Sequence, residues 1–330
     1  MNITIRPLEV PGDYERMAEL LNIIFSEPTW AERLEEDDRK MYKQGKLTYD
    51  DENKLTGYDR IRLAAQSPDG LMIGYANSWR APWTEAGTLH HTLVVDAKHR
   101  NKGVGSALAG ALEQWAHEMK ASEIVVNVAD HDESSIAFAQ KRGYLTARHA
   151  FKSILKPAEF VEASEGDYEL RLVSEGIRFF TLLEEPGEES ELKLYQLYKQ
   201  AAADIPGNRE SYPNVSEWKK WFLHLEGYRP ELVLIAADGS RYVGVVHLLH
   251  NEKTSGMYHE FTGVDREYRG RHIASALKIR AIRLSKLLNV PYMSTHNDSA
   301  NAPMLAINRN RLGYIASPGN YRMIKELRSD

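Results

Sequence analysis

Residues 95–108 read VDAKHRNKGVGSAL, and residues 264–277 read VDREYRGRHIASAL. Both stretches begin with Val-Asp, carry an arginine five residues after the valine, and end with Ser-Ala-Leu. The two arginines, Arg100 and Arg269, are 169 residues apart. Two further pairs match at an offset of 170 residues, namely 73–74 with 243–244 and 143–144 with 313–314. Three anchors at nearly one offset indicate an internal repeat. We therefore predict two copies of one domain, at residues 1–157 and 171–330, joined by a polar linker at 158–170.

Each copy has the same expected order of elements, and this order predicts an α/β fold. A strand opens the copy (residues 3–5 or 177–181), and helical segments and two strands around a turn follow. The next strand ends at Val95 or Val264 and leads through the repeated loop into a long helix with apolar residues on one side. Another strand and a helix ending at Gly143 or Gly313 complete the copy. We predict that each half is a mixed, splayed sheet flanked by helices.

Composition excludes several classes of function. The net charge of −5 argues against a nucleic-acid-binding protein, which needs a basic surface. The sequence has no cysteine, so thiolate metal sites and cysteine catalysis are excluded. The histidines do not predict a metal site either, since His247 and His250 would face opposite sides of one strand. No apolar run approaches the ~20 residues that cross a bilayer, and the first residues lack the apolar core of a signal peptide. A cytoplasmic protein without metal is expected.

The repeated loops carry a phosphate-binding pattern. The segment from Arg100 to Gly105 fits Arg/Gln-x-x-Gly-x-Gly/Ala completely, and the segment from Arg269 to Ala274 fits except at His272. This pattern, with its strand–loop–helix context, resembles the pyrophosphate signature of the GNAT superfamily of N-acetyltransferases. Tandem members such as mycothiol synthase are similar in layout. The resemblance covers nearly the whole chain outside the linker and implies acetyl-CoA as co-substrate.

A pyrophosphate requires several N–H donors that converge on one point, and the first turn of a helix offers them. Small residues let the phosphate oxygens approach the backbone, and basic side chains add charge-assisted hydrogen bonds. The expected CoA-binding residues of the first copy are Val95, Arg100, Lys102, Gly103, Val104, Gly105 and Ser106. Those of the second copy are Val264, Arg269, Gly270, Arg271, His272, Ile273, Ala274, Ser275 and Asn301.

His272 replaces the glycine that the resemblance leads us to expect. If this position is already helical, the loss of glycine is not costly. We predict that CoA binding is retained. The alternative is that the second copy is a degraded, structural domain.

The resemblance implies a tyrosine that protonates the leaving thiolate, four residues before the final Gly-Tyr or Gly-Phe. The first copy has Ala139 there, which cannot donate a proton. In the second copy this segment is one residue longer than usual, so a forward count from Asn301 gives Asn308 and a backward count gives Arg309. We prefer Asn308, although an amide is a poor acid. Asn301 matches the asparagine that contacts CoA in the family, whereas the first copy has Asp132 there.

The strand that ends at Val264 offers a general base. Tyr258, Glu260 and Thr262 are predicted to share one face by alternation, and Glu260 could take a proton from an amine. A surface carboxylate without a catalytic role is the alternative. A strand bulge near Val264, as the resemblance implies, would let a backbone N–H meet the thioester oxygen. In the first copy His91 matches Glu260.

These residues together predict an acetyl-CoA-dependent N-acetyltransferase that acts on the amine of a small molecule. The second copy is the expected catalyst, with Glu260, Asn308 and Val264 as its catalytic residues. A silent acyl-CoA-binding sensor or scaffold, and an acetyltransferase acting on protein amines, remain the alternatives. Neither nucleic acid nor membrane is an expected partner, and the chain is expected to be a monomer or a homodimer.

Overall fold

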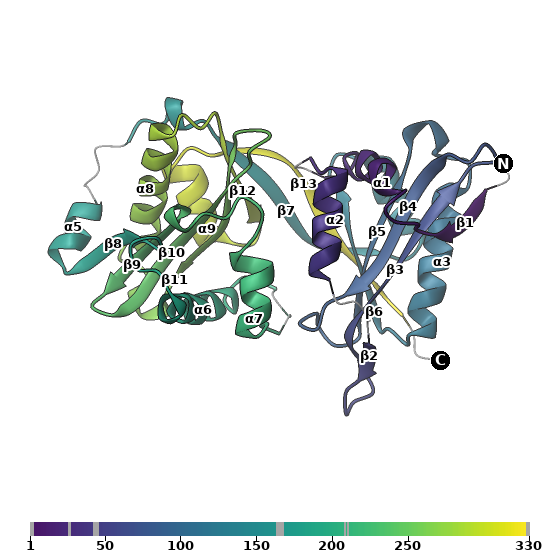
Figure 1. Cartoon of the computed structure of the whole chain (residues 1–330), viewed down its shortest axis with the longest axis horizontal. Helices are drawn as coiled ribbons and strands as arrows, with labels where there is room; N and C mark the ends of the chain where they lie inside the picture. The colour runs from purple at the N-terminus through teal and green to yellow at the C-terminus, as the bar shows by residue number, and fades with distance from the viewer. Residues whose placement is uncertain are drawn as a thin grey trace. The chain divides into compact units, whose positions relative to one another are not determined.

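The computed structural model describes residues 3–25, 28–41, 46–162, 168–207, 209 and 211–327 (Figure 1). The chain forms two compact units. Unit 1 contains Met1–Arg148 together with Asn320–Asp330, and unit 2 contains His149–Gly319. The predicted linker includes residues 163–167, which lie outside the described residues.

Unit 1 is a mixed sheet with helices on both faces. Its strand order is β1-β3-β4-β5-β6-β13, with β2 paired to β3, and among its described strands β5 and β6 are the one parallel pair. The strands are β1 (Thr4–Pro7), β2 (Lys46–Tyr49), β3 (Leu55–Gln66), β4 (Met72–Arg80), β5 (Thr88–Val95), β6 (Glu123–Ala129) and the end of β13 (Ile315–Glu326). The helices are α1 (Tyr14–Leu21), α2 (Ala31–Lys40), α3 (Val104–Glu118) and α4 (Glu133–Lys141).

Unit 2 repeats this order as β8-β9-β10-β11-β12-β7, with β11 and β12 as the parallel pair. The strands are β8 (Ile177–Thr181), β9 (Val233–Asp238), β10 (Arg241–His250), β11 (Met257–Val264), β12 (Met293–Asp298) and the second part of β7 (Leu145–Leu155). The helices are α5 (Tyr168–Ser174), α6 (Glu188–Ala202), α7 (Val215–Trp218), α8 (Ile273–Leu287) and α9 (Ala302–Leu305). The predicted α/β fold and its duplication are confirmed.

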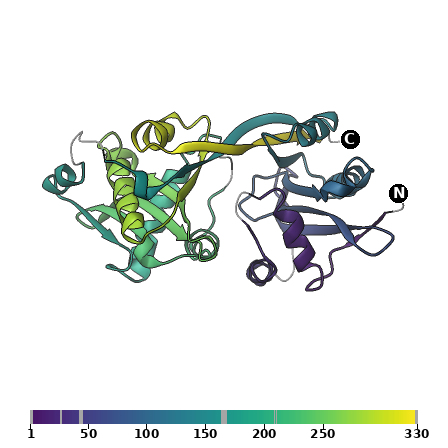
Figure 2. The same cartoon turned by 90° about the horizontal axis from the view of Figure 1, so that it is seen from above.

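The two copies exchange their last strands. The C-terminal strand β13 pairs with β6 of unit 1 through Asn320–Glu326, and β7 pairs with β12 of unit 2 through Ala150–Leu155. Figure 2 shows both long strands, β7 in teal and β13 in yellow. The boundaries of the two compact units therefore differ from the boundaries of the two copies in the sequence.

Each face of the unit 2 sheet has its own apolar core. On one face, α8 packs against β9, β10 and β11, with Ile273 and Leu277 in the cluster. On the other face, α6 and α7 form an aromatic-rich cluster that includes Tyr198 and Trp218. We call these the α8 face and the α6 face. Both faces of β10 are covered, which explains the near-continuous apolar run of its sequence.

Gly74 and Gly244, which anchor the repeat, let a helix approach the sheet. A Cβ at Gly244 would lie 2.5 Å from a methyl carbon of Ile273, and one at Gly74 would lie 3.0 Å from a methyl carbon of Leu108. Both contacts are made by the helix that follows the repeated loop. A side chain at either glycine would push the helix and its N-terminus away from the strand.

We expect Gly244→Ala to lower the free energy of unfolding by about 1–3 kcal/mol, the usual cost of overpacking a core. Gly110→Ala is the matched control, because no atom lies within 4 Å of a Cβ built there in the interior of α3. The control should be neutral or slightly stabilising, since alanine is the better helix former. Urea denaturation of both variants measures the difference, and equal stabilities would contradict the packing argument.

Two helices of unit 2 contain π-helical turns. One follows α7 at Lys219–Leu223, and the other follows α9 at Ala306–Arg311. The second turn absorbs the additional residue that the sequence predicted between 301 and 314. Asn214 caps α7 by accepting a hydrogen bond from the Glu217 N–H at 3.0 Å.

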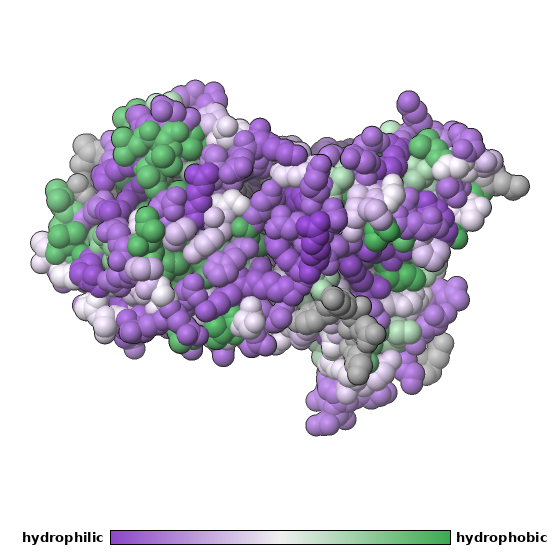
Figure 3. Space-filling view, viewed as in Figure 1, coloured by the Kyte–Doolittle hydropathy of each residue, from purple (hydrophilic) through white to green (hydrophobic). Residues whose placement is uncertain are grey.

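Apolar side chains also reach the surface of unit 2. Leu287 and Leu288 at the end of α8 are 80% and 54% exposed, and Leu170 and Val173 of α5 are also exposed. Figure 3 shows hydrophobic patches over these elements. The oligomeric state stays a prediction.

Candidate active site

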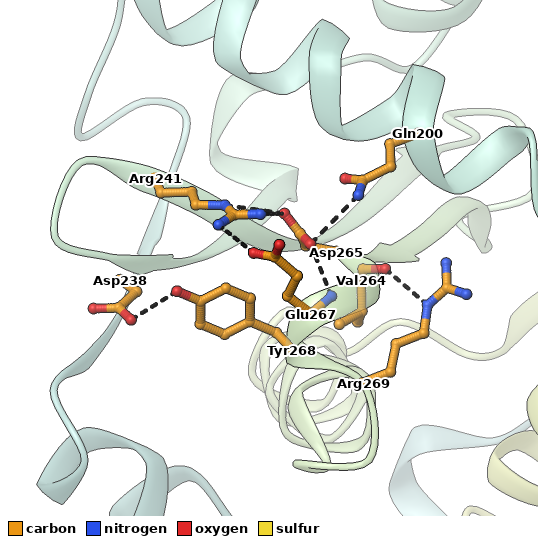
Figure 4. Close-up of polar contacts among 8 residues, drawn as sticks. All are labelled: Gln200, Asp238, Arg241, Val264, Asp265, Glu267, Tyr268 and Arg269. Atoms are coloured by element: carbon orange, nitrogen blue, oxygen red, sulfur yellow. Dashed lines mark hydrogen bonds and ion pairs between the residues drawn. The ribbon is translucent and has the colours of Figure 1, made fainter.

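In both copies, the arginine that follows the valine by five residues donates a hydrogen bond to the carbonyl oxygen of that valine. The Nε of Arg100 donates to the carbonyl oxygen of Val95 at 3.3 Å. In the second copy, the Nε of Arg269 donates to the carbonyl oxygen of Val264 at 3.2 Å (Figure 4). Each guanidinium group therefore closes its own loop onto the end of the preceding strand.

Both loops place left-handed residues at the same two positions. In the first copy these are Asn101 (φ 60°) and Gly103 (φ 86°), and in the second copy they are Gly270 (φ 79°) and His272 (φ 70°). The glycine is at the second of these positions in the first copy and at the first position in the second copy, and the backbone conformation is the same in both. The condition that His272 is already helical is therefore not met, because the helix begins one residue later. The left-handed conformation costs a residue with a Cβ roughly 1–2 kcal/mol.

The His272 ring is fixed by two neighbours. It stacks on Tyr168 with 4.7 Å between the ring centroids, and its Nδ1 accepts a hydrogen bond from Arg311 at 2.9 Å. These contacts offset part of the backbone strain. The substitution therefore leaves the loop with the shape found in the first copy.

The first turn of the helix after each loop has unused donors. The first bonds within these helices run from Ala107 N to Gly103 O and from Ala276 N to His272 O, and no side chain caps either helix. Within the described part of the chain, three N–H groups per helix therefore make no hydrogen bond; they belong to Val104, Gly105 and Ser106, and to Ile273, Ala274 and Ser275. Such a cradle of N–H groups fits a pyrophosphate.

The basic side chains of the loops are held by carboxylates. Arg269 contacts Asp204 at 2.5 Å, Arg271 contacts Glu175 at 2.7 Å, and Arg100 contacts Asp132 at 3.2 Å. The Lys102 ammonium donates to a backbone carbonyl, that of Lys98. Exposed ion pairs contribute only about 0–1 kcal/mol, so a phosphate can take the place of these carboxylates at small cost.

The base of the second loop is held by hydrogen bonds to a buried carboxylate. Asp265 is 4% exposed, and its carboxylate accepts hydrogen bonds from Arg241 at 2.6 Å and from Gln200 at 3.4 Å (Figure 4). The same carboxylate accepts the N–H of Glu267 at 3.0 Å. Asp204 also holds Arg266, and the hydrogen bond from Arg266 is the main reason why the pKa of Asp204 falls to about 2. Its charge is therefore present at every working pH.

Arg311 is a functional candidate that sequence reasoning missed. Its Nη1 donates to the Ser275 hydroxyl at 2.9 Å as well as to His272, so the guanidinium group lies at the N-terminus of α8. A basic residue two positions before Gly313 was the available signal. A cation at this point adds to the attraction for a phosphate.

The strand β11 bulges at Glu260. His247 of β10 pairs with Phe261, and the next residue, Leu248, pairs with His259, so Glu260 has no partner in the ladder. Val264 pairs regularly with Gly244. The bulge that the resemblance implies near Val264 therefore lies four residues earlier, at Glu260. A bulge leaves one residue outside the ladder and redirects its side chain.

The bulge also reverses the alternation along β11. Phe261 packs against the cluster on the α6 face, whereas Val264 packs against the cluster on the α8 face. Thr262, two residues before Val264, therefore belongs to the α8 face. Tyr258, Glu260 and Thr262 do not share one face as predicted, because the additional residue shifts the pattern by one.

Glu260 is a half-buried carboxylate without a counter-ion. Within the described residues it makes neither a hydrogen bond nor an ion pair, and burial raises its pKa to about 7. Its charge lies close enough to the buried Tyr198 to help raise the pKa of that phenol, an effect second to burial. An unpaired carboxylate in such surroundings is costly, which makes a cationic ligand favourable.

Unit 1 lacks these features where it can be compared. Its β4 and β5 pair without a register shift, from Gly74 with Val95 to Trp79 with His90. The sequence offset matches His91 to Glu260, but in the ladders His91 pairs with Ser78 as His259 pairs with Leu248. Burial lowers the pKa of His91 to about 3, and that of His90 to about 4. His91 is therefore a much weaker base than Glu260. Ala139 lies in the core, 6% exposed.

Asp132 and Asn301, which cap the helices at the expected CoA sites, differ in how many of their side-chain polar atoms lack a partner. Asp132 accepts hydrogen bonds from Ser134, Ser135 and Arg100, so its carboxylate is satisfied within the protein. These contacts outweigh burial and lower the pKa of Asp132 to about 2. The side-chain oxygen of Asn301 accepts, among the described residues, the Met304 N–H alone, at 3.3 Å. Its amide nitrogen donates to no other described residue and remains available.

Asn308 is buried, at 1% exposure, in the π-helical turn after α9. Its amide nitrogen donates to Asn297 Oδ1 at 2.7 Å, and Asn297 donates to the Ser153 hydroxyl at 2.8 Å. Its own Oδ1 has no partner among the described atoms. The visible role of Asn308 is to join the helix to β12 and β7, and its predicted place beside the sulfur stays a prediction.

The part of the chain that the structure describes contains no group of three metal-binding side chains close enough to hold an ion. None of its helices is long and apolar enough to cross a membrane.

The sequence model of the acetyltransferase (GNAT) family matches residues 17–144 and 192–314, most of both copies. The chain belongs to this family. Solved structures that resemble it include a GCN5-related N-acetyltransferase from Sphaerobacter thermophilus, with a TM-score of 0.71, 20% identity, and coverage of 99% of this chain and 96% of that one. A tandem GNAT protein from the clavulanic acid biosynthesis pathway has a TM-score of 0.73, 15% identity and full coverage of both chains. These similarities show the fold. No curated protein matches the chain.

Proposed function

We propose that this member of the family transfers the acetyl group of acetyl-CoA to the amine of a small molecule, and that unit 2 carries out the transfer. The observation that carries the proposal is Glu260, an unpaired, half-buried carboxylate at a bulge in the strand that leads to the α8 loop. The unused N–H groups of Ile273, Ala274 and Ser275 would hold the pyrophosphate, with Arg269 and Arg311 beside them. Asn301 would donate its free amide to the same ligand.

The chemistry follows from the protonation state of the acceptor. An alkylamine is an ammonium ion at neutral pH and must lose a proton before its nitrogen can attack. Glu260, with a pKa of about 7, is suited to accept that proton near neutral pH. The nitrogen lone pair then forms a bond to the thioester carbonyl carbon, and the carbon–sulfur bond breaks. The sulfur leaves with the electron pair of that bond and takes a proton from Glu260 or from water. The attacking nitrogen, which is cationic after the bond forms, loses its second proton to water and becomes the neutral amide nitrogen.

We propose that unit 1 does not turn over. Its candidate base His91 is buried, and burial lowers the pKa of that imidazole to about 3, so it attracts a proton poorly. The carboxylate of Asp132 stands where unit 2 has the neutral Asn301. Its loop nevertheless keeps the anion-binding shape, which favours a unit that binds an acyl-CoA without catalysis.

The proposal is tested with two matched variants, Arg269→Glu and Arg100→Glu, in an assay of thiol release from acetyl-CoA with a panel of amines. We expect Arg269→Glu to raise KM for acetyl-CoA and Arg100→Glu to leave turnover unchanged, because only the loop of unit 2 serves catalysis. A loss of turnover in Arg100→Glu alone would assign the chemistry to unit 1. Absence of turnover with every amine, despite acetyl-CoA binding, would favour the sensor or scaffold alternative.

The double variant Arg100→Glu/Arg269→Glu tests cofactor binding itself. We expect isothermal titration to find at least one acetyl-CoA site in the wild-type protein and an affinity at least tenfold lower in the double variant. Two charge reversals remove two favourable contacts and add two repulsive ones at the expected pyrophosphate positions. Lys98→Glu is the control, because this exposed charge lies outside the signature. Unchanged affinity in the double variant would contradict the assigned loops.

A further inference from the structure

The surroundings of Glu260 on the α6 face are aromatic. Tyr198 of α6 stacks on Phe261 with 4.0 Å between the ring centroids and an angle of 16°. Tyr228 meets His247 edge to face at 6.0 Å, and His247 is the residue that pairs with Phe261 across the bulge. Tyr228 and Phe261 are only partly buried, so this group of rings reaches the surface beside the carboxylate.

A buried hydrogen bond fixes these rings. The Tyr198 hydroxyl lies 2.8 Å from Nδ1 of His247, and both residues are at most 2% exposed. Burial lowers the pKa of His247 to about 3 and raises that of Tyr198 well above its usual value, so both are neutral at working pH. We assign Tyr198 as the donor to Nδ1, which places the imidazole proton on Nε2. That Nε2–H is buried and has no partner among the described residues.

Two more buried donors on this face lack partners, namely Nε1 of Trp218 and the hydroxyl of Tyr212. Trp218 packs edge to face on Tyr198 at 5.3 Å, so it belongs to the same cluster. Buried polar atoms almost always have a partner, and these three donors of one aromatic cluster have none among the described residues. They point to a ligand that carries a hydrogen-bond acceptor.

Among the described residues, the charges that act on these rings include one partly buried, unpaired carboxylate that can receive an amine. Glu260 is the carboxylate that lies among the rings. Glu191 is already paired with Lys219 at 2.6 Å, and Glu231 is exposed. A second ammonium group on the same ligand would thus meet a neutralised pair or a solvated carboxylate, and the rings would have to desolvate it. Aromatic rings favour one cation close to their faces together with an apolar body.

We infer that the acceptor is a primary monoamine carried on an aromatic body, with a hydrogen-bond acceptor such as a hydroxyl or ether oxygen on that body. Its ammonium group pairs with Glu260, its ring packs between Tyr228 and Phe261, and its oxygen accepts from Nε2 of His247. The inference rests on the proposed function, because it names the substrate class of the same site.

The test compares three amines in the thiol-release assay, namely tyramine, n-butylamine and spermidine. We expect kcat/KM for tyramine to exceed that of either other amine at least tenfold. Equal or better turnover of n-butylamine or spermidine overturns the inference and leaves the proposed function in place. Binding of acetyl-CoA without acetylation of any of the three amines counts against the proposed function itself, and the inference falls with it.

The variant Tyr228→Ala separates recognition from chemistry. It removes a partly buried ring at the edge of the cluster, and we expect KM for tyramine to rise at least fivefold while kcat/KM for n-butylamine is unchanged. Tyr49→Ala, which removes a 43% exposed ring in unit 1, is the matched control and should alter neither. Thermal unfolding confirms that Tyr228→Ala is folded. An equal loss with both amines would overturn the aromatic site.

Discussion

Replacing Glu260 with glutamine is expected to lower kcat by roughly 10²- to 10⁴-fold, the usual contribution of a general base. Glutamine keeps the size and the polar end of the side chain and cannot accept a proton from an ammonium ion. KM for acetyl-CoA should change little, because the predicted CoA contacts lie at the loop and at α8. Residual turnover from the proximity of the reactants should remain.

The pH profile gives this prediction a second readout. Glu260 acts as a base only when ionised, and its pKa is about 7, so kcat of the wild-type protein should rise with pH through that value and then level off. The glutamine variant should lose this inflection. His91→Gln is the matched control in unit 1 and should keep both kcat and the profile. An unchanged profile in Glu260→Gln would remove this residue from the mechanism.

Stability should move in the opposite direction to activity. Because the folded pKa of Glu260 lies above the unfolded value, the folded state binds more protons between those two values. The contribution of this group to stability is therefore present at low pH and is lost as the pH rises through about 7. Above that pH the glutamine variant should be at least as stable as the wild-type protein. A loss of activity without a loss of stability distinguishes a catalytic role from a structural one.

The sequence predicted the parts of the fold that depend on local geometry. The five-residue interval between Val95 and Arg100 allows a hydrogen bond between these two residues. The glycine at 74 or 244 allows a close approach between helix and strand. Gly143 and Gly313 end their helices in the left-handed conformation, as glycines after helices commonly do. Each anchor satisfies a steric or hydrogen-bonding demand within a few residues, so it is preserved in both copies and can be recognised without a structure.

The features that the sequence did not predict depend on partners far along the chain. The bulge at Glu260 exists because β10 and β11 pair out of register, and alternation within β11 alone placed Thr262 on the wrong face. The left-handed conformation of His272 is supported by Tyr168 and Arg311, which are distant in sequence. The exchange of β7 and β13 involves strands that close each sheet, and a repeat in the sequence gives no sign of it.

Lys278 is another feature that only the structure reveals. It lies on α8 at 1% exposure, and it has no carboxylate partner among the described residues. Its Nζ lies 5.7 Å from the centre of the Tyr314 ring. Both ring nitrogens of the buried His259 and the hydroxyl of Tyr314 also lack partners. Burial lowers the pKa of Lys278 from 10.5 to about 7.

We expect Lys278→Met to stabilise unit 2 by about 2–4 kcal/mol at pH 7, because methionine fills a similar volume without a charge to desolvate. At roughly 1.4 kcal/mol per pKa unit, the fall in the lysine pKa corresponds to a cost on the order of 4–5 kcal/mol at low pH. For a unit of this size the melting temperature should rise by roughly 5–10 °C. Lys286→Met on the exposed side of the same helix is the control and should have little effect.

The pH dependence decides whether burial of the charge is the cause. The unfolded chain keeps the lysine proton up to a pH near 10.5, whereas the folded protein releases it above about 7. Between these values the unfolded state binds more protons, so the free energy of unfolding of the wild-type protein should increase with pH from 7 to 10. Lys278→Met should lose that increase, and the gap between the two proteins should narrow as the pH rises. A variant less stable than the wild-type protein at pH 7 would show instead that the ammonium group is stabilised by the polar groups around Tyr314 and His259 by more than its desolvation costs.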